Sequence, residues 1–491
     1  MSHFPAAPPL PTPPSPEPAR RRWLWPAAGA ALLVVVVGLG AVTAYQYLAG
    51  DDAGPPHPEA WDSRVAPYAE QVEKLRGLDF KQPVYVDFLS TKEFKAKVEV
   101  DDEGLDEEER TEIEQYEGML RALGLIDAKV DIVKAMSDNS TGGTLAYYDP
   151  EDERIRMRGR ELTPASTATL VHELTHALQD QHFDLESKLD DDDATQASMH
   201  RAVAEGDASR IEHLWVNDLP AKKRAAVEKA QQRTYEQGMK ELAGVPAFVQ
   251  AVAGAPYALG EPLSTLATAA EGLKGANDLF DDAPTNDEHL LKPLSWLNDK
   301  EKAKKVPEVE LAKGESAIED ADGEFGALGW LFTLAERVPV LTALDAADAW
   351  GGDHYRSYTS KGRVCVRAHF TGDDASGTAL MKSALTTWVA RAPRGTASLT
   401  QVEDHLVFTS CDPEKATTRS SEASLDALTL AATRSTLAAQ GAEAPGMSDT
   451  IAWCFADNVV HRLSIEQLTS DELPPGFEET MTEIAMDCRA S

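Results

Sequence analysis

Two histidines and a glutamate form the pattern H-E-x-x-H in the stretch LVHELTHALQDQHFDL, residues 170–185. On a helix, His172 and His176 differ by about 40° around the axis, so both imidazoles project from one face and can bind one ion. Glu173 is turned to the side, where it can reach a water on the metal. The pattern predicts a Zn²⁺ site for hydrolysis, because zinc lowers the pKa of water to about 7 and the glutamate can act as general base.

His182 is one candidate for the third metal ligand, since it aligns with the last histidine of the metzincin pattern H-E-x-x-H-x-x-G-x-x-H. In that pattern a glycine breaks the helix and turns the chain back toward the metal. Here Gln179 occupies the glycine position, so the helix can continue and His182 would lie about 240° around it from His176. We expect His182 to be a packing residue or to lie near the substrate, and a three-histidine site stays the alternative.

Glu205 is the other candidate, 29 residues after His176 in the run RAVAEGDAS. This run belongs to a second predicted helix, at about 196–216. The small residues around Glu205 would let this helix pack tightly against the first and bring the carboxylate to the ion. A solvated glutamate is the alternative, but the run also has apolar residues on one face. We therefore expect Glu205 to be the third ligand.

The motif HELTHALQDQHFDL, followed by A-x-x-EGDA, resembles the glutamate-ligand zinc metallopeptidases, the gluzincins. It is similar in particular to a set of bacterial exported proteins that carry HEL-x-HALQDQ-x-F. The resemblance implies that His172, His176 and Glu205 ligate zinc and that Glu173 is the general base. It is specific over about residues 140–210, and weaker similarities follow in APTNDEHLLKP (283–293), WGGDHY (350–355) and SCDP (410–413).

One position departs from the gluzincins of the thermolysin type, which often have an acid four residues after the ligand glutamate. Here that position is Ser209. A ligand imidazole usually donates its outer N–H to an acceptor that fixes the ring. Asp180 and Asp207 are the candidates for this acceptor.

The gluzincin fold also implies an edge strand above the metal that pairs with an extended peptide substrate. Leu145 to Tyr148 is the candidate for this strand, and an ordinary sheet strand is the alternative. The residue that stabilises the oxyanion is not assigned. Its candidates are Tyr148, His289, His354 and Tyr355.

The N-terminus predicts a membrane anchor. Residues 1–22 are a Pro-rich tail that ends in three arginines, and residues 23–48 contain a long apolar run without charge. The positive-inside rule places the tail in the cytoplasm and the rest of the chain outside it. A signal peptide cleaved after Ala44, which would give a secreted protein, is the alternative. The net charge of −35 argues against nucleic acid as a partner.

The four cysteines lie in the last 127 residues, which suggests two disulfides in an exported C-terminal domain. Three pairings are possible. Pairing neighbours closes the shortest loops, so we expect Cys365–Cys411 and Cys454–Cys488. A tetrathiolate zinc site is less favoured, because the chain has no C-x-x-C.

The expected fold class is α+β, with a single transmembrane helix, a zincin-like metallopeptidase domain and a smaller disulfide-bonded α+β domain. The domains follow a linker at 49–78 and are expected at 79–339 and 340–491. In the first domain the patterns predict a strand at 82–89, a hairpin at 142–159 and a helix that opens at Thr163-Pro164. In the second they predict strands at 362–370, 404–411 and 449–463, and helices at 375–391 and 424–440.

These features together predict a membrane-anchored zinc metalloendopeptidase that hydrolyses peptide or protein substrates outside the cytoplasm. The alternative from another class is a surface binding or scaffold protein whose zinc site is structural or vestigial. The intact Glu173 argues against that alternative, since a structural site has no use for a general base.

Overall fold

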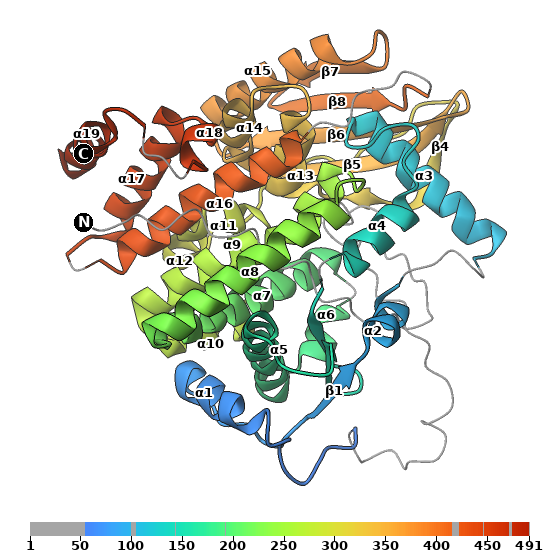
Figure 1. The fold of residues 1–491 in the computed structure, drawn as a ribbon. Coiled ribbons are helices and arrows are strands. Elements are labelled where there is room, and N and C mark those ends of the chain that lie inside the picture. The colour runs from blue at the N-terminus through green and yellow to red at the C-terminus, as the bar shows by residue number, and fades with distance from the viewer. Residues whose placement is uncertain are drawn as a thin grey trace.

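The computed structural model describes residues 55–99, 105–142, 144–191, 193–414, 422–444, 446–470 and 474–490. Over these residues the chain forms 19 helices and two sheets (Figure 1), so the predicted α+β class is confirmed. The predicted cytoplasmic tail, 1–22, and the predicted transmembrane helix, 23–48, lie outside the described residues. Among the helices that are described, none combines the length and the apolar character that a membrane crossing needs.

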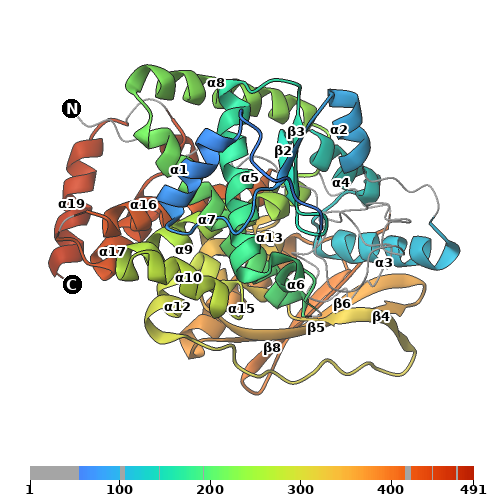
Figure 2. The ribbon, with the colours of Figure 1, turned by 90° about the horizontal axis from the view of Figure 1, so that it is seen from below.

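A three-stranded sheet lies beside the histidine helix (Figure 2). It consists of β1 (Tyr85–Leu89), β2 (Ala146–Asp149) and β3 (Arg154–Arg158), in the order β1-β3-β2. β1 pairs parallel with β3, and β2 pairs antiparallel with it. The predicted strand at 82–89 and the predicted hairpin at 142–159 are confirmed, and β2 is an edge strand.

The predicted histidine helix is α5 (Pro164–Phe183). The side chain of Thr163 accepts a hydrogen bond from the backbone N–H of Ser166, and the backbone N–H of Thr163 donates to the side chain of Ser166. Pro164 stands at the first helical position, where no N–H is needed. The helix then runs unbroken past Gln179, as expected without the metzincin glycine.

The second predicted helix is α7 (Ala194–Asp218), which packs against both α5 and the apolar helix α9 (Ala247–Glu271). The backbones of α7 and α9 come close at two glycines. A Cβ atom on Gly206 would lie 2.2 Å from the carbonyl oxygen of Gly260, so only glycine fits this approach. The contact fixes α7 at the residue that follows Glu205.

The five-stranded sheet is antiparallel, with the order β4-β5-β6-β8-β7. Val364, Val366 and Phe370 share one face of β6, and helices cover that face. On the other face, His369 donates a hydrogen bond to the carbonyl oxygen of Pro307, in a coil segment that crosses the sheet. The strands are β4 (Glu315–Gly323), β5 (Trp350–Ser360), β6 (Arg363–Gly372), β7 (Ala397–Val402) and β8 (His405–Cys411).

The remaining helices surround these sheets and α9. They are α1 (Ala66–Arg76), α2 (Thr91–Val98), α3 (Glu107–Leu123), α4 (Ile132–Thr141), α6 (Leu185–Leu189), α8 (Ala221–Glu241), α10 (Leu273–Asp281), α11 (Glu288–Leu291), α12 (Pro293–Asp299), α13 (Gly326–Ala335), α14 (Val340–Ala347), α15 (Ala375–Arg391), α16 (Ala423–Ala442), α17 (Asp449–Arg462), α18 (Ile465–Leu468) and α19 (Phe477–Ala490). Helices α15 and α16 confirm the predicted helices at 375–391 and 424–440. Strands β6 and β8 confirm the predicted strands at 362–370 and 404–411.

The predicted strand at 449–463 is wrong, because this segment is helix α17. Its β-branched and aromatic residues favour a strand locally. Its buried residues, however, are Ala452, Ala456, Val459 and Val460, which share one face of a helix. Ser448 also caps the helix by accepting a hydrogen bond from the backbone N–H of Ile451.

The largest hydrophobic cluster contains residues from both predicted domains, from Ile113 on α3 to Val460 on α17. The predicted boundary at residue 339 falls between α13 and α14, and both helices contribute to this cluster. A second cluster packs α5 against α1 and the three-stranded sheet. The metal-ligand helices α5 and α7 therefore each have one side in a hydrophobic core.

Both expected disulfides are present. Cys365–Cys411 joins directly paired residues of β6 and β8. Cys454–Cys488 joins α17 to α19, at the edge of the molecule that Figure 1 shows in red. Beside this second disulfide, Ile484 and Val459 belong to a small cluster separate from the main core.

We expect the variant Cys454→Ala/Cys488→Ala to release α19 and leave the rest of the chain folded. The disulfide closes a loop of 34 residues, and such a loop stabilises the attached segment by about 3–4 kcal/mol. Hydrogen exchange should show lost protection over 477–490 and unchanged protection over α5 and β6. The matched variant Cys365→Ala/Cys411→Ala should lower the Tm of the whole protein, and lost protection of β6 in the first variant would contradict this prediction.

Candidate metal centre

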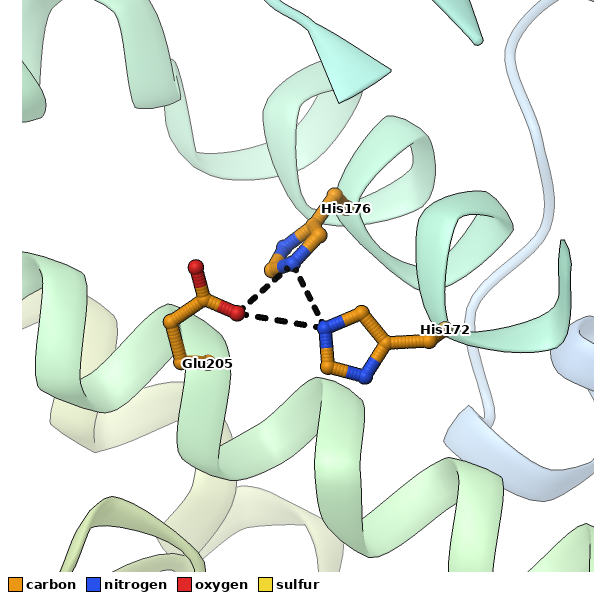
Figure 3. A group of neighbouring side chains, drawn as sticks. All are labelled: His172, His176 and Glu205. Carbon is orange, nitrogen blue, oxygen red and sulfur yellow. Dashed lines mark hydrogen bonds and ion pairs between the residues drawn. The ribbon is translucent and has the colours of Figure 1, made fainter. Parts of the chain in front are cut away.

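Three donor atoms from two helices meet in the interior of the protein (Figure 3). Nε2 of His172, Nε2 of His176 and Oε2 of Glu205 form a triangle whose three sides are each 3.1 Å. The two histidines come from successive turns of α5, and Glu205 comes from α7. All three side chains are buried. The structure thus brings together the three residues that the sequence predicts as ligands.

The triangle has the size that a bound metal ion requires. In a tetrahedral zinc site with bonds of about 2.0–2.1 Å, the ligand atoms lie about 3.3 Å from one another. In the neutral form of His176 that donates from Nδ1 to Gln179, the lone pair of Nε2 faces Glu205 at 3.1 Å. A cation between these atoms would remove the repulsion, so the group could bind a metal ion.

Gln179 orients His176. Its Oε1 can only accept, so His176 Nδ1 donates to it at 2.9 Å, and in the neutral ring Nε2 then carries the lone pair. The amide of Gln179 donates in turn to the carbonyl oxygen of Ala204 and to Asp207, both at 3.0 Å. Asp207 is held by the fully buried Arg76 of α1. Gln179, which stands in place of the metzincin glycine, therefore connects α5 to α7.

Glu212 faces the outer nitrogen of His172. Its Oε2 lies 3.5 Å from His172 Nδ1, and its Oε1 accepts a hydrogen bond from Gln231 on α8. Burial by itself would raise the pKa of Glu212, but the interactions with His172 and Gln231 bring this pKa below its ordinary value. The carboxylate is thus charged and attracts the imidazole of His172, although the geometry is not that of a hydrogen bond.

Glu173 lies beside the triangle and is not one of its corners. Its Oε2 accepts a hydrogen bond of 2.7 Å from the backbone N–H of Tyr148, on the edge strand β2. Burial raises the pKa of Glu173 above its ordinary value, while His172 and His176 act in the opposite direction. A carboxylate with a raised pKa next to a metal site is suited to accept and return a proton.

Asp180 and Asp207, the two predicted acceptors for a ligand imidazole, make other contacts. Asp180 accepts a hydrogen bond from the hydroxyl group of Tyr148 at 2.7 Å and another from the backbone N–H of Leu185 at 2.8 Å. Burial raises its pKa to about 6. Asp207 acts on His176 only through Gln179. Direct contacts to the ligand imidazoles come instead from Gln179 and Glu212, which sequence reasoning missed in this role.

One signal in the sequence could have found Glu212. It stands seven residues after Glu205, so both side chains lie on the same face of α7, two turns apart. No comparable signal marks Tyr257 of α9, whose ring stacks on that of His172 at a centroid distance of 6.0 Å.

The other histidine candidates point elsewhere. Nε2 of His182 donates to the carbonyl oxygen of Asp79 at 2.9 Å, so the side chain is turned away from the triangle. His289 bonds to Ser295 and to the backbone of Glu301, and His354 accepts from the backbone N–H of Val309. Among the four candidates for oxyanion stabilisation, Tyr148 is the residue that contacts Glu173.

A pocket of about 390 Å³ opens beside the triangle. Its walls include the two ligands His176 and Glu205, and Tyr148 of the edge strand. Pro150 after that strand and Arg201 of α7 also line it. A ligand in this pocket would therefore contact the metal-binding residues and the edge strand at the same time.

We expect Gln179→Leu to lower the affinity for zinc about 10–100-fold, because it removes the acceptor that fixes the His176 ring. Competition with a chromogenic chelator measures the affinity. Gln181→Leu is the matched control, since Gln181 lies on the same helix but bonds to Lys81 and Gln82. Equal zinc affinity in wild type and Gln179→Leu would show that this hydrogen bond does not support the site.

No family model, no curated protein and no solved structure matches this chain. The resemblance to the gluzincins therefore stays an expectation from the motifs around residues 140–210. The structure itself adds a buried group, His172, His176 and Glu205, that could bind a metal ion.

Proposed function

We propose that the protein is a zinc-dependent metalloendopeptidase in which Glu173 is the general base. The observation that carries the proposal is the position of Glu173. Its carboxylate interacts electrostatically with His172, His176 and Glu205, and it is bonded to the edge strand that would bind a peptide. A scaffold protein with a structural zinc site would need neither feature.

Zinc is the metal that fits this donor set best. Two imidazoles and one carboxylate are typical of catalytic zinc, which keeps a fourth position for water or substrate. Structural zinc sites are usually closed by four protein ligands. His172, His176 and Glu205 would hold the ion, which supplies a Lewis acid that makes water more acidic and polarises a carbonyl group.

Glu173 supports hydrolysis through its surroundings. The N–H of Tyr148 fixes one carboxylate oxygen at 2.7 Å. Burial raises the pKa of the carboxyl group, so the carboxylate is a better proton acceptor than one in water. Glu173 can take a proton from the attacking water and pass it to the leaving amine.

The outer edge of β2 supports binding of an extended peptide. The carbonyl oxygen of Leu145 accepts a hydrogen bond from the N–H of Arg158, so residues 145, 147 and 149 direct their backbone groups toward β3. The backbone groups of Ala146 and Tyr148 therefore point outward, and Tyr148 does bond to Glu173 on that side. A substrate strand would add to this edge by backbone pairing.

The membrane anchor and the extracytoplasmic location belong to the proposal. The anchor rests on residues 23–48, which lie outside the described part of the chain. Two disulfides support export, since disulfides persist outside reducing compartments.

We expect Glu173→Gln to retain bound zinc and to lose peptide cleavage about 10²–10⁴-fold, because the amide cannot accept the proton. The test is cleavage of a peptide library by the full chain, with zinc measured by mass spectrometry of the metal. Glu161→Gln makes the same charge change at an exposed position and should cleave like wild type. Bound zinc with equal cleavage in wild type and Glu173→Gln would favour the scaffold alternative.

The third ligand has its own test. We expect Glu205→Ala to lose bound zinc and His182→Ala to keep it, because His182 contacts the backbone of Asp79 and not the triangle. Zinc stoichiometry of the two purified variants is the measurement. Full zinc in Glu205→Ala together with loss in His182→Ala would establish the three-histidine metzincin site instead.

A further inference from the structure

A second pocket, of about 310 Å³, lies at the start of α7. Its walls come from three segments that are far apart in the sequence. Thr195 and Ser198 belong to α7, Asn286 and Asp287 precede α11, and Glu324 precedes α13. Each of these five side chains offers an oxygen atom, and Met199 and Phe325 also line the pocket.

The buried side chain of Asn286 indicates that the pocket has a ligand. Its side chain is only 3% exposed, yet neither its amide oxygen nor its amide nitrogen has a hydrogen-bond partner. A buried amide without partners costs about 1–3 kcal/mol, so native proteins seldom leave one in that state. A bound ion with its water shell would satisfy both atoms.

The pocket also has an excess of negative charge. The backbone N–H groups at the start of α13 already donate hydrogen bonds to two buried carboxylates. Asp287 accepts from the N–H groups of residues 327 and 328, and Asp353 from those of residues 325 and 326. Gly326 permits this arrangement, since it has a φ of +69° and a Cβ there would lie 2.4 Å from an Asp287 oxygen. Glu324 adds a third carboxylate, which is not the acceptor in any of these four hydrogen bonds.

The pKa values of these carboxyl groups are consistent with a site for a cation. Burial, and then the neighbouring carboxylates, raise the pKa of Asp287 and of Glu324 to about 7. For Glu324 these neighbours are Asp353 and Asp193, the residue that caps α7. A positive charge in the pocket would compensate them and return both pKa values toward the ordinary range.

We propose that this pocket binds a calcium ion. Calcium prefers six to eight oxygen ligands from carboxylates, amides, carbonyl groups and water, which is the donor chemistry present here. Zinc in proteins is bound mainly by thiolate sulfur and imidazole nitrogen, and the lining residues offer neither, since the sulfur of Met199 is a thioether. The ligands would be Glu324, Asp287 and the amide oxygen of Asn286, with the hydroxyl groups of Thr195 and Ser198 at the α7 side.

The position of the pocket gives the ion a structural effect. Ser198 and Glu205 are seven residues apart, so they lie on the same face of α7 at a distance of about 10 Å along its axis. An ion in the pocket would connect the start of α7 to α13 and to the segment before α11. It would thereby stabilise the helix that carries Glu205.

The test is isothermal titration of the full chain with CaCl₂, at constant zinc. We expect one calcium per chain with a Kd of about 10⁻⁴–10⁻³ M, and a Tm that rises by several degrees on calcium addition. Glu324→Gln and Asn286→Leu should each weaken binding at least tenfold. Glu319→Gln removes the same charge from an exposed position on β4 and should bind like wild type.

Two further measurements make the result unambiguous. Glu205→Ala should keep calcium binding, which separates this pocket from the metal centre and from the proposed peptidase activity. Circular dichroism of Glu324→Gln, whose side chain is partly exposed, verifies that weaker binding does not reflect an unfolded variant. The proposal is wrong if 10 mM CaCl₂ gives no binding heat, or if both pocket variants bind like wild type. It is also wrong if the pocket binds a lysine side chain instead. In that case a lysine-rich peptide would bind to wild type but not to Glu324→Gln, and wild type would not bind calcium.

Discussion

Close backbone packing of α7 on α9 is the contact on which the candidate metal centre depends. At Gly206 and Gly260 the two helices approach so closely that a Cβ atom on either residue would overlap the other backbone. Glu205 directly precedes the first of these glycines, and α7 also packs against α5, which carries the two histidines. An ion site needs such fixed positions, because donor atoms displaced by even an ångström no longer share one metal ion. Small residues around Glu205 are therefore as much a part of the site as the ligands.

Buried charges connect the metal centre to the start of the described chain. Arg76 at the end of α1 pairs with Asp207 at 2.6 Å, and both side chains are almost fully buried. Asp207 then bonds to Gln179, which orients His176. A buried ion pair rarely adds much net stability, since desolvation offsets the attraction, but removing one partner is costly. The pair is better explained by orientation: it holds α1, α5 and α7 in the one arrangement that points His176 at Glu205.

The sequence predicted the three residues whose donor atoms meet, and it missed the side chains that contact the two imidazoles. The spacing of His172 and His176, the cap at Thr163 and the unbroken helix past Gln179 are local, and the structure confirms them. Glu205 was reachable because small residues mark a tightly packed helix. The contact between Gln179 and Asp207, by contrast, joins positions 28 residues apart, and Asp287 meets the start of α13 only in the folded chain. The prediction of a strand at 449–463 was wrong for a local reason. The β-branched residues there favour a strand, and they obscured the helical spacing of the buried residues.

In the proposed peptidase, substrate binding and proton transfer would share one strand. The N–H of Tyr148 that holds Glu173 belongs to the outward edge of β2, where an extended peptide would pair. The same residue is fixed through its hydroxyl group by Asp180, and Asp180 also bonds to the backbone at the start of α6. A shift of β2 on substrate pairing would therefore move the hydrogen bond to Glu173 and change the environment of its carboxylate. In the proposed site the strand that receives the substrate would also position the general base, so a single backbone amide would couple peptide binding to the state of the Glu173 carboxylate.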